Sequence, residues 1–184
     1  MEKEHYLKKE LYELVSKDPN IFEFLEKGAL DGIWYWDIEN MENEWMSERF
    51  WLNFGYDPKT KKHLASEWQD IINQDDLKLA VDNFQKHCDD PKHPYDQVVR
   101  YTKADGSISW VRCRGIGIRD KDGKVIRFLG VHIDVSELKQ REQELNEKID
   151  ELSRLNKLMI NRELKMINMK KEIQDLRQEL KDSK

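Results

Sequence analysis

From residue 137 to the end, the chain contains neither glycine nor proline. Apolar residues recur there at every seventh position, which is the repeat of helices that wind around each other. At 1.5 Å per residue, a helix of this length extends about 65–70 Å. Such a helix has to bury its apolar stripe, most simply against a second copy of itself. The predicted seam consists of Leu138, Leu145, Leu152, Leu155, Met159, Met166, Met169, Ile173, Leu176 and Leu180.

The predicted seam is interrupted by cations at Arg141, Lys148 and Arg162. Near its start, Ile149 and Asn156 fit a second register. We expect a parallel coiled-coil homodimer with two competing registers, while folding back or pairing with another protein are the alternatives. A helix pair with two registers is the kind of bistable element that signalling requires.

Charge and aromatic content divide the chain into three segments, predicted as residues 1–27, 28–136 and 137–184. The first has helical spacing and is predicted to form an N-terminal helical cap. All six tryptophans lie in the second segment. Its fold class is predicted as α+β, because two strand-like runs are followed by short helices and then by three more strands. The predicted strands cover residues 33–38, 44–46, 95–103, 108–119 and 125–135.

Two Asp-Gly pairs, at residues 105–106 and 122–123, separate the last three predicted strands. Asp-Gly between strand-like runs is a strong signal for a hairpin turn, so these strands should form an antiparallel meander. Between the second and third strands, Ser47 is predicted to cap one helix, and Asp75 or Asp76 to cap a longer one.

Several functional classes are disfavoured by the composition. With 32 Lys+Arg against 37 Asp+Glu, the chain lacks the excess of cations that nucleic-acid binding needs. No apolar run is long enough to insert into a membrane, and no signal peptide is visible, so a cytoplasmic location is expected. Two cysteines, Cys88 and Cys113, make neither a disulfide framework nor a metal site. No phosphate loop, metalloprotease motif or kinase or cyclase signature is present, and an enzyme is not expected.

The middle segment resembles the PAS sensory domains, in particular a bacterial subgroup rich in tryptophan. The resemblance rests on the order and spacing of several motifs over residues 28–139. They are G-I-W-Y-W-D-I at 32–38, F-G-Y at 54–56, R-Y-T-K-A-D-G-S at 100–107 with W-V-R at 110–112, R-D-K-D-G-K at 119–124 and G-V-H-I-D-V-S at 130–136. Asn73-Gln74 replace the subgroup's usual His-Pro. The resemblance implies a five-stranded antiparallel sheet that encloses a pocket with the short helices.

The resemblance also indicates which side chains of each strand face the pocket. The light-oxygen-voltage branch has a flavin-facing glutamine where this chain has His132. By that alignment, the pocket candidates are Trp34, Trp36, Arg100, Val111, Cys113 and His132. The opposite face would carry Ile33, Tyr35, Val99 and Tyr101, covered by the N-terminal helices.

The ligand of this pocket stays open, as either no cofactor or a small metabolite, with flavin or haem as further options. The reactive cysteine motif of the light-oxygen-voltage branch is absent, and Cys113 is expected to be a small core residue. His132 is expected to be a satisfied buried histidine, although pH sensing and haem binding are alternatives. Trp34 and Trp36 either fill the pocket or stack on a planar cofactor. An inward Arg100 would need an acidic partner.

The exit from the last strand, Asp134, Ser136 and Glu137, is the predicted signal relay. Asp134 and Glu137 have the spacing of a capping box at the start of the C-terminal helix. The resemblance adds a salt bridge from Asp134 to an arginine or lysine.

These observations lead to one main hypothesis, a cytoplasmic bacterial sensor module, for instance of a two-component system. It would pass the state of its pocket or of a protein partner through the coiled coil to an output domain or signalling partner. The alternatives are a docking or dimerisation adaptor with a filled pocket, and the sensory fragment of a histidine kinase or diguanylate cyclase.

Overall fold

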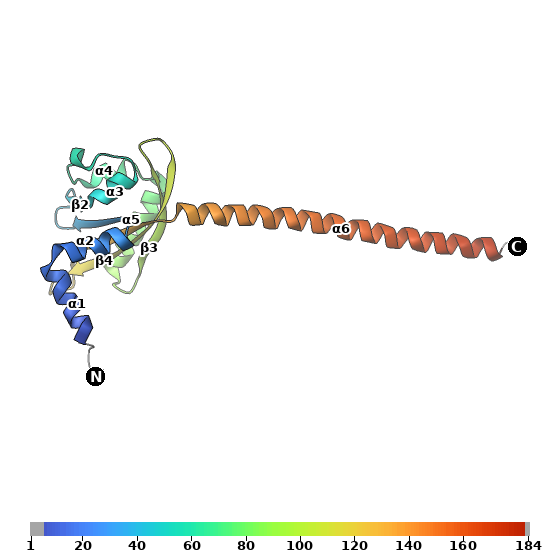
Figure 1. Cartoon of the computed structure of the whole chain (residues 1–184), viewed down its shortest axis with the longest axis horizontal. Helices are drawn as coiled ribbons and strands as arrows, with labels where there is room; N and C mark the ends of the chain where they lie inside the picture. The colour runs from blue at the N-terminus through green and yellow to red at the C-terminus, as the bar shows by residue number, and fades with distance from the viewer. Residues whose placement is uncertain (1–5, 183–184) are drawn as a thin grey trace. The chain divides into compact units, whose positions relative to one another are not determined.

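The computed structural model describes residues 6–182 (Figure 1). The chain divides into two compact units, which meet between Glu137 and Leu138. The helices are α1 (Tyr6–Lys17), α2 (Pro19–Ala29), α3 (Glu48–Asn53), α4 (Ala65–Gln69), α5 (Gln74–Asp89) and α6 (Ser136–Asp182), with a short 3-10 turn η1 (Pro58–Thr60). The strands are β1 (Gly32–Asp37), β2 (Glu44–Met46), β3 (Tyr95–Thr102), β4 (Ile108–Arg119) and β5 (Val125–Asp134).

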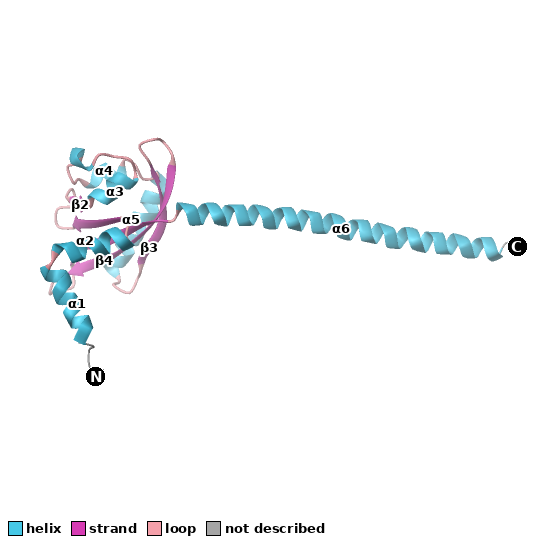
Figure 2. Cartoon of the chain, viewed as in Figure 1, coloured by secondary structure: helices cyan, strands magenta, loops and turns pink. Residues whose placement is uncertain are grey.

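The five strands, magenta in Figure 2, form one antiparallel sheet. Their order in the sheet is β2-β1-β5-β4-β3. This confirms the predicted α+β fold. β5 lies in the centre, between β1 and β4. Gly106 and Gly123 of the two Asp-Gly turns both have a φ of 83°, a left-handed conformation that glycine adopts without steric cost. The predicted hairpin turns are therefore present at both positions.

Two helix starts differ from the prediction in their capping. Helix α5 is capped by Asn73, whose side chain accepts hydrogen bonds from the backbone N–H groups of Asp75 and Asp76. The prediction of Asp75 or Asp76 as the cap was thus wrong by two or three residues. Ser47 precedes α3 as expected, but its hydroxyl accepts a hydrogen bond from the Ile33 backbone N–H instead of capping the helix.

The core lies between the inner face of the sheet and the helices α3–α5. The Trp34 indole stacks parallel to the Phe128 ring, with 5.5 Å between ring centroids. Two glycines make room for this pair. A Cβ at Gly130 would collide with Trp34, and one at Gly115 would lie 2.6 Å from the Phe128 ring. Trp34 therefore lies flat on the sheet only because its neighbours on β4 and β5 lack side chains.

The outer face of the sheet keeps a row of exposed apolar side chains. Leu129 on β5 is the register partner of both Tyr35 on β1 and Ile116 on β4. These three side chains are 38–59% exposed. Apolar residues of α2, including Phe22 and Phe24, are exposed as well. The prediction that the N-terminal helices cover this face is therefore wrong for this row.

Helix α6 is one uninterrupted helix of 47 residues. All seam residues whose side chains are described, from Leu138 to Ile173, are exposed. The seam residues Leu176 and Leu180 lie outside the residues with described side chains. Among the described helices, none is both long and apolar enough to span a membrane.

Candidate functional site

A cavity of about 310 Å³ opens on the inner face of the sheet. Its volume is at the lower end of the range for small-molecule sites, roughly 300–1,000 Å³. Exposed residues of the β1–β2 turn and of α5, Met41, Val81 and Gln85, form its rim. The remaining wall consists of Trp34, Trp36, Glu44, Met46, Trp68, Gln69, Ile72, Ala80, Phe84, Tyr95, Gln97, Val99, Tyr101, Cys113 and His132.

Four of the six predicted pocket residues lie in this wall, namely Trp34, Trp36, Cys113 and His132. The two tryptophans do not fill the space between them. Trp34 packs on Phe128, and Trp36 packs on Phe84 of α5 with ring centroids 5.0 Å apart. Val111 is buried in the core but does not line the cavity.

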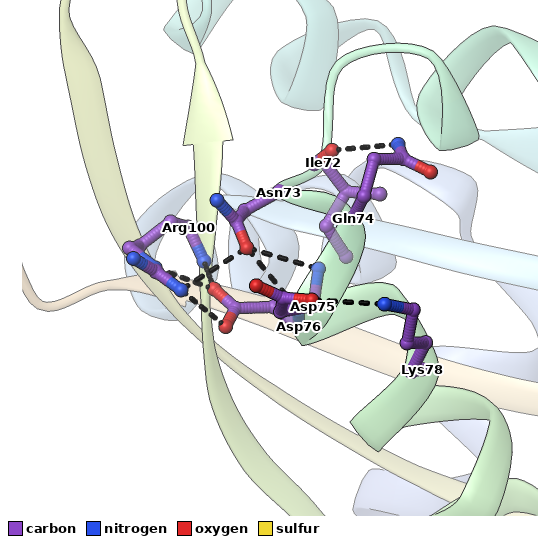
Figure 3. A network of polar contacts seen from close by, with 7 residues as sticks. All are labelled: Ile72, Asn73, Gln74, Asp75, Asp76, Lys78 and Arg100. Carbon is purple, nitrogen blue, oxygen red and sulfur yellow. Dashed lines mark hydrogen bonds and ion pairs between the residues drawn. The ribbon is translucent and has the colours of Figure 1, made fainter.

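Arg100 points away from the cavity, which corrects the prediction of an inward arginine. Its guanidinium forms a two-pronged ion pair with Asp76, with Nε–Oδ2 and Nη2–Oδ1 distances of 2.8 Å (Figure 3). The Arg100 backbone N–H also donates to Asp76, and Nη2 donates to the Asn73 side chain. The network therefore ties the first turn of α5 to strand β3.

The error arose from the phase assigned to β3. Val99 is the register partner of Val111, and both are buried on the inner face. Tyr101 follows two residues later and is 2% exposed. Val99 and Tyr101 therefore line the cavity, although the prediction placed them on the opposite face.

We expect Asp76→Ala to lower the free energy of unfolding, because it removes the acceptor of the Arg100 backbone N–H and the ion-pair partner of the Arg100 guanidinium. Asp75→Ala is the matched control, because the Asp75 carboxylate is 82% exposed and pairs only with Lys78 at the surface. Urea denaturation of both variants measures the difference. Equal stabilities would contradict a structural role for the pair.

Hydrogen bonds from Arg100 lower the pKa of Asp76. The stabilising effect of the pair is therefore present above the ordinary pKa of an aspartate and is lost as the pH falls below it.

Glu44 is the wall residue that sequence reasoning missed. It lies on β2, is 4% exposed, and its Oε2 accepts a hydrogen bond of 2.5 Å from the Trp68 indole N–H. Burial raises the pKa of the Glu44 carboxyl to about 8, although the bond from Trp68 acts in the opposite direction. The alternation of β2, Glu-Trp-Met, places Glu44 on the same side as Met46, and both side chains are buried.

The other titratable groups of the wall are uncharged near neutral pH. Burial lowers the pKa of His132 to about 3, so its ring is neutral. Burial also raises the pKa values of Tyr95, Tyr101 and Cys113. Cys113 is therefore a protonated, buried thiol, as expected for a core residue.

Three polar atoms of the wall residues are buried without a hydrogen-bond partner, Trp34 Nε1, Gln97 Nε2 and His132 Nδ1. The prediction of a satisfied His132 is thus wrong for Nδ1. Buried polar groups are nearly always paired, since leaving one unpaired costs about 1–3 kcal/mol.

The start of α6 is anchored to β4 by a cluster of small polar groups. The Asp134 carboxylate accepts hydrogen bonds of 2.8 Å from the Ser109 hydroxyl and from the Ser136 backbone N–H. The Ser136 hydroxyl in turn accepts a bond of 2.8 Å from the Trp110 backbone N–H. Glu137 lies in the first turn of α6.

Among the described residues, Asp134 does not form the expected salt bridge. Its carboxylate is bonded to hydroxyl and amide groups instead. Burial acts to raise the pKa of Asp134, but hydrogen bonds from Ser136 and Ser109 outweigh it and the pKa is lowered. The carboxylate is therefore ionised at neutral pH and can hold the first turn of the helix.

Comparisons with known proteins agree with this architecture. A family profile described as "PAS fold" matches residues 43–132. An uncharacterised protein, y4lL, of Sinorhizobium fredii is 29% identical over 97 residues, which cover 53% of this chain. The match spans only 11% of that relative's length.

Solved structures show the same topology. A sensory box histidine kinase/response regulator from Burkholderia thailandensis has a TM-score of 0.62 and 25% identity over 72% of this chain and 98% of that one. The N-terminal domain of a diguanylate cyclase with PAS/PAC sensor from Marinobacter aquaeolei shares the fold, with a TM-score of 0.51 and 18% identity over 59% of this chain and 97% of that one. The profile match and the shared topology together show that this chain carries a PAS domain in residues 43–132.

Proposed function

We propose that this chain is a sensor module whose cavity binds a small metabolite and whose state is passed to helix α6. The observation that supports the proposal most directly is the cavity itself, which has an open rim and a largely aromatic wall. A volume of about 310 Å³ suits a compact ligand. Signal sensing also fits the PAS-containing kinase and cyclase chains that share the fold.

Strand β5 is the proposed route from the cavity to the helix. His132 lies in the cavity wall, and Asp134 follows two residues later on the same strand. Ser136, the first residue of α6, is bonded to Asp134 and to Trp110 on β4. A ligand that shifts β5 relative to β4 would therefore strain the bonds that hold the first turn of α6.

We further propose that α6 forms a parallel coiled-coil homodimer. Its support is the exposed stripe, since apolar side chains that repeat every seven residues along a long exposed helix need a partner. Sedimentation equilibrium of the full chain is expected to give a dimer, and Leu152→Glu, in the stripe, to give a monomer. A monomeric parent chain would contradict this part of the proposal.

The relay is tested by Asp134→Ala, which should leave the PAS domain folded but weaken the first turn of α6 by about 1 kcal/mol. Hydrogen exchange of the amides in residues 136–143 is expected to speed up about fivefold. Asp120→Ala is the matched control, because Asp120 accepts similar local bonds from the Asp122 and Lys124 backbone N–H groups in the β4–β5 turn, at the opposite end of β4 from Ser109. If both variants exchange like the parent protein, Asp134 does not hold the helix start.

The sensing role is tested on protein purified without added ligand. Native mass spectrometry is expected to show a retained metabolite, and an absorption spectrum from 300 to 700 nm to show no visible band. If the protein is purified empty, a compound of a metabolite library is expected to bind. Ala80→Phe should abolish this binding by filling the cavity. Ala80 is 4% exposed and lies in the cavity wall. Failure of every library compound to bind, in a protein purified empty, would favour the adaptor alternative.

A further inference from the structure

The cavity wall is rich in aromatic side chains. Six aromatic side chains line it, Trp34, Trp36, Trp68, Phe84, Tyr95 and Tyr101. The faces of aromatic rings carry partial negative charge and attract cations, by roughly 2 kcal/mol where water is excluded. The same wall contains one carboxyl group, that of Glu44.

The Glu44 carboxyl has no cationic partner in the part of the chain that the structure describes. Among the described residues, neither lysine nor arginine lines the cavity, and the one side-chain hydrogen bond to Glu44 comes from the neutral Trp68 indole. Trp68 binds Oε2 and so fixes the orientation of the carboxyl group. A buried carboxylate without a counter-ion is costly, and a cation placed beside it removes that cost.

We propose, resting on the ligand-binding role above, that the cavity selects a small organic cation, an ammonium or amidinium group on a compact apolar body. The charged group would lie against Glu44 and the ring faces, and the apolar body against Met46, Ile72 and Ala80, which also line the cavity. The structure thus assigns Glu44 as the residue that determines the charge of the ligand.

The proposal has a specific consequence for pH dependence. The titratable wall residues of other elements are Tyr95 and Tyr101 of β3, Cys113 of β4 and His132 of β5, and Trp68 of α4 bonds to Glu44 directly. Trp68 does not titrate, and the pKa values of the other four residues leave them uncharged near neutral pH. The affinity for a permanent cation should therefore follow the ionisation of Glu44 alone, whose pKa in the free protein is about 8. It should be on the order of a hundredfold weaker at pH 6 than at pH 9.

The test compares two molecules of the same shape, benzyltrimethylammonium and its uncharged carbon analogue neopentylbenzene. Their binding to the full chain is measured by calorimetry at pH 6 and pH 9, with Glu44→Gln and the cavity-filling Ala80→Phe as variants. At pH 9, we expect the cation to bind at least tenfold more tightly than the neutral analogue. In Glu44→Gln the pH dependence should disappear and the preference for the cation should fall to what the aromatic rings alone supply, while Ala80→Phe should lose both ligands.

The outcomes separate the two proposals. If the neutral analogue binds as well as the cation and Glu44→Gln changes neither affinity, the cavity binds small molecules but the cation inference is overturned. If neither molecule binds and the metabolite library also fails, the sensing proposal falls with it. If the cation binds Ala80→Phe as well as the parent, it binds outside the cavity, and the inference is overturned as well.

Discussion

Glu44→Gln is expected to stabilise the ligand-free protein at alkaline pH by roughly 4 kcal/mol. In the folded protein, burial raises the pKa of Glu44 from 4.5 to about 8. Between these values the unfolded chain has released the proton while the folded chain keeps it, so stability falls as the pH rises. Glutamine keeps an oxygen that can accept the bond from Trp68 but has no proton to lose.

The measurement is the free energy of unfolding in urea for both proteins from pH 4 to pH 9. The two curves should coincide near pH 4, where Glu44 is protonated in both states, and separate progressively up to about pH 8. A constant difference at all pH values would mean that Glu44 is not buried as an acid.

His132→Leu is expected to have the opposite pH dependence. Burial lowers the pKa of His132 from 6.5 to about 3. Between these pH values the unfolded chain binds a proton at His132 that the folded chain does not bind. Stability is therefore lost as the pH falls from 6.5 towards 3, by roughly 4 kcal/mol in total. Leucine removes this loss, and the variant should be more stable than the parent at pH 4 relative to pH 7.

Each variant is the control for the other, because Glu44→Gln should change the curve above pH 4.5 and His132→Leu the curve below pH 6.5. Where the two ranges overlap, the opposing slopes cancel, and the parent protein should have a plateau of stability there. If His132→Leu shows the same acid sensitivity as the parent, the histidine is protonated in the folded state.

The strands and the antiparallel meander of the last three were predictable because local signals agreed with the tertiary fold. The two Asp-Gly turns fixed the ends of β3, β4 and β5 to within a residue or so. The motif at residues 130–136 located the junction at which β5 ends and α6 begins. Turn geometry and helix capping depend on neighbouring residues, so the sequence contains them directly.

The composition of the cavity was less predictable because it depends on which side of a strand faces inward. In β3, both faces carry large side chains, and an arginine beside a tyrosine gives no clear alternation. The inward-facing side of β3 was therefore inferred from the alignment with a related branch of the family, which placed Arg100 inside and Tyr101 outside. Glu44 was missed for a related reason, since an acid on a short strand is usually exposed, and only the tertiary structure shows that Trp68 covers it.

The position of His132 on β5 also bears on the speed of a response. Ser136 lies four positions further along the chain, at most about 13 Å away. Both ends of this segment are held by direct hydrogen bonds or ladder pairs to β4, with Cys113 opposite His132 and Ser109 bonded to Asp134. No domain has to rotate and no segment has to fold between the cavity and the helix. Local backbone adjustments take nanoseconds to microseconds, whereas bound molecules stay for milliseconds or longer. We therefore expect the residence time of the ligand, and not the protein, to set how long a signal lasts.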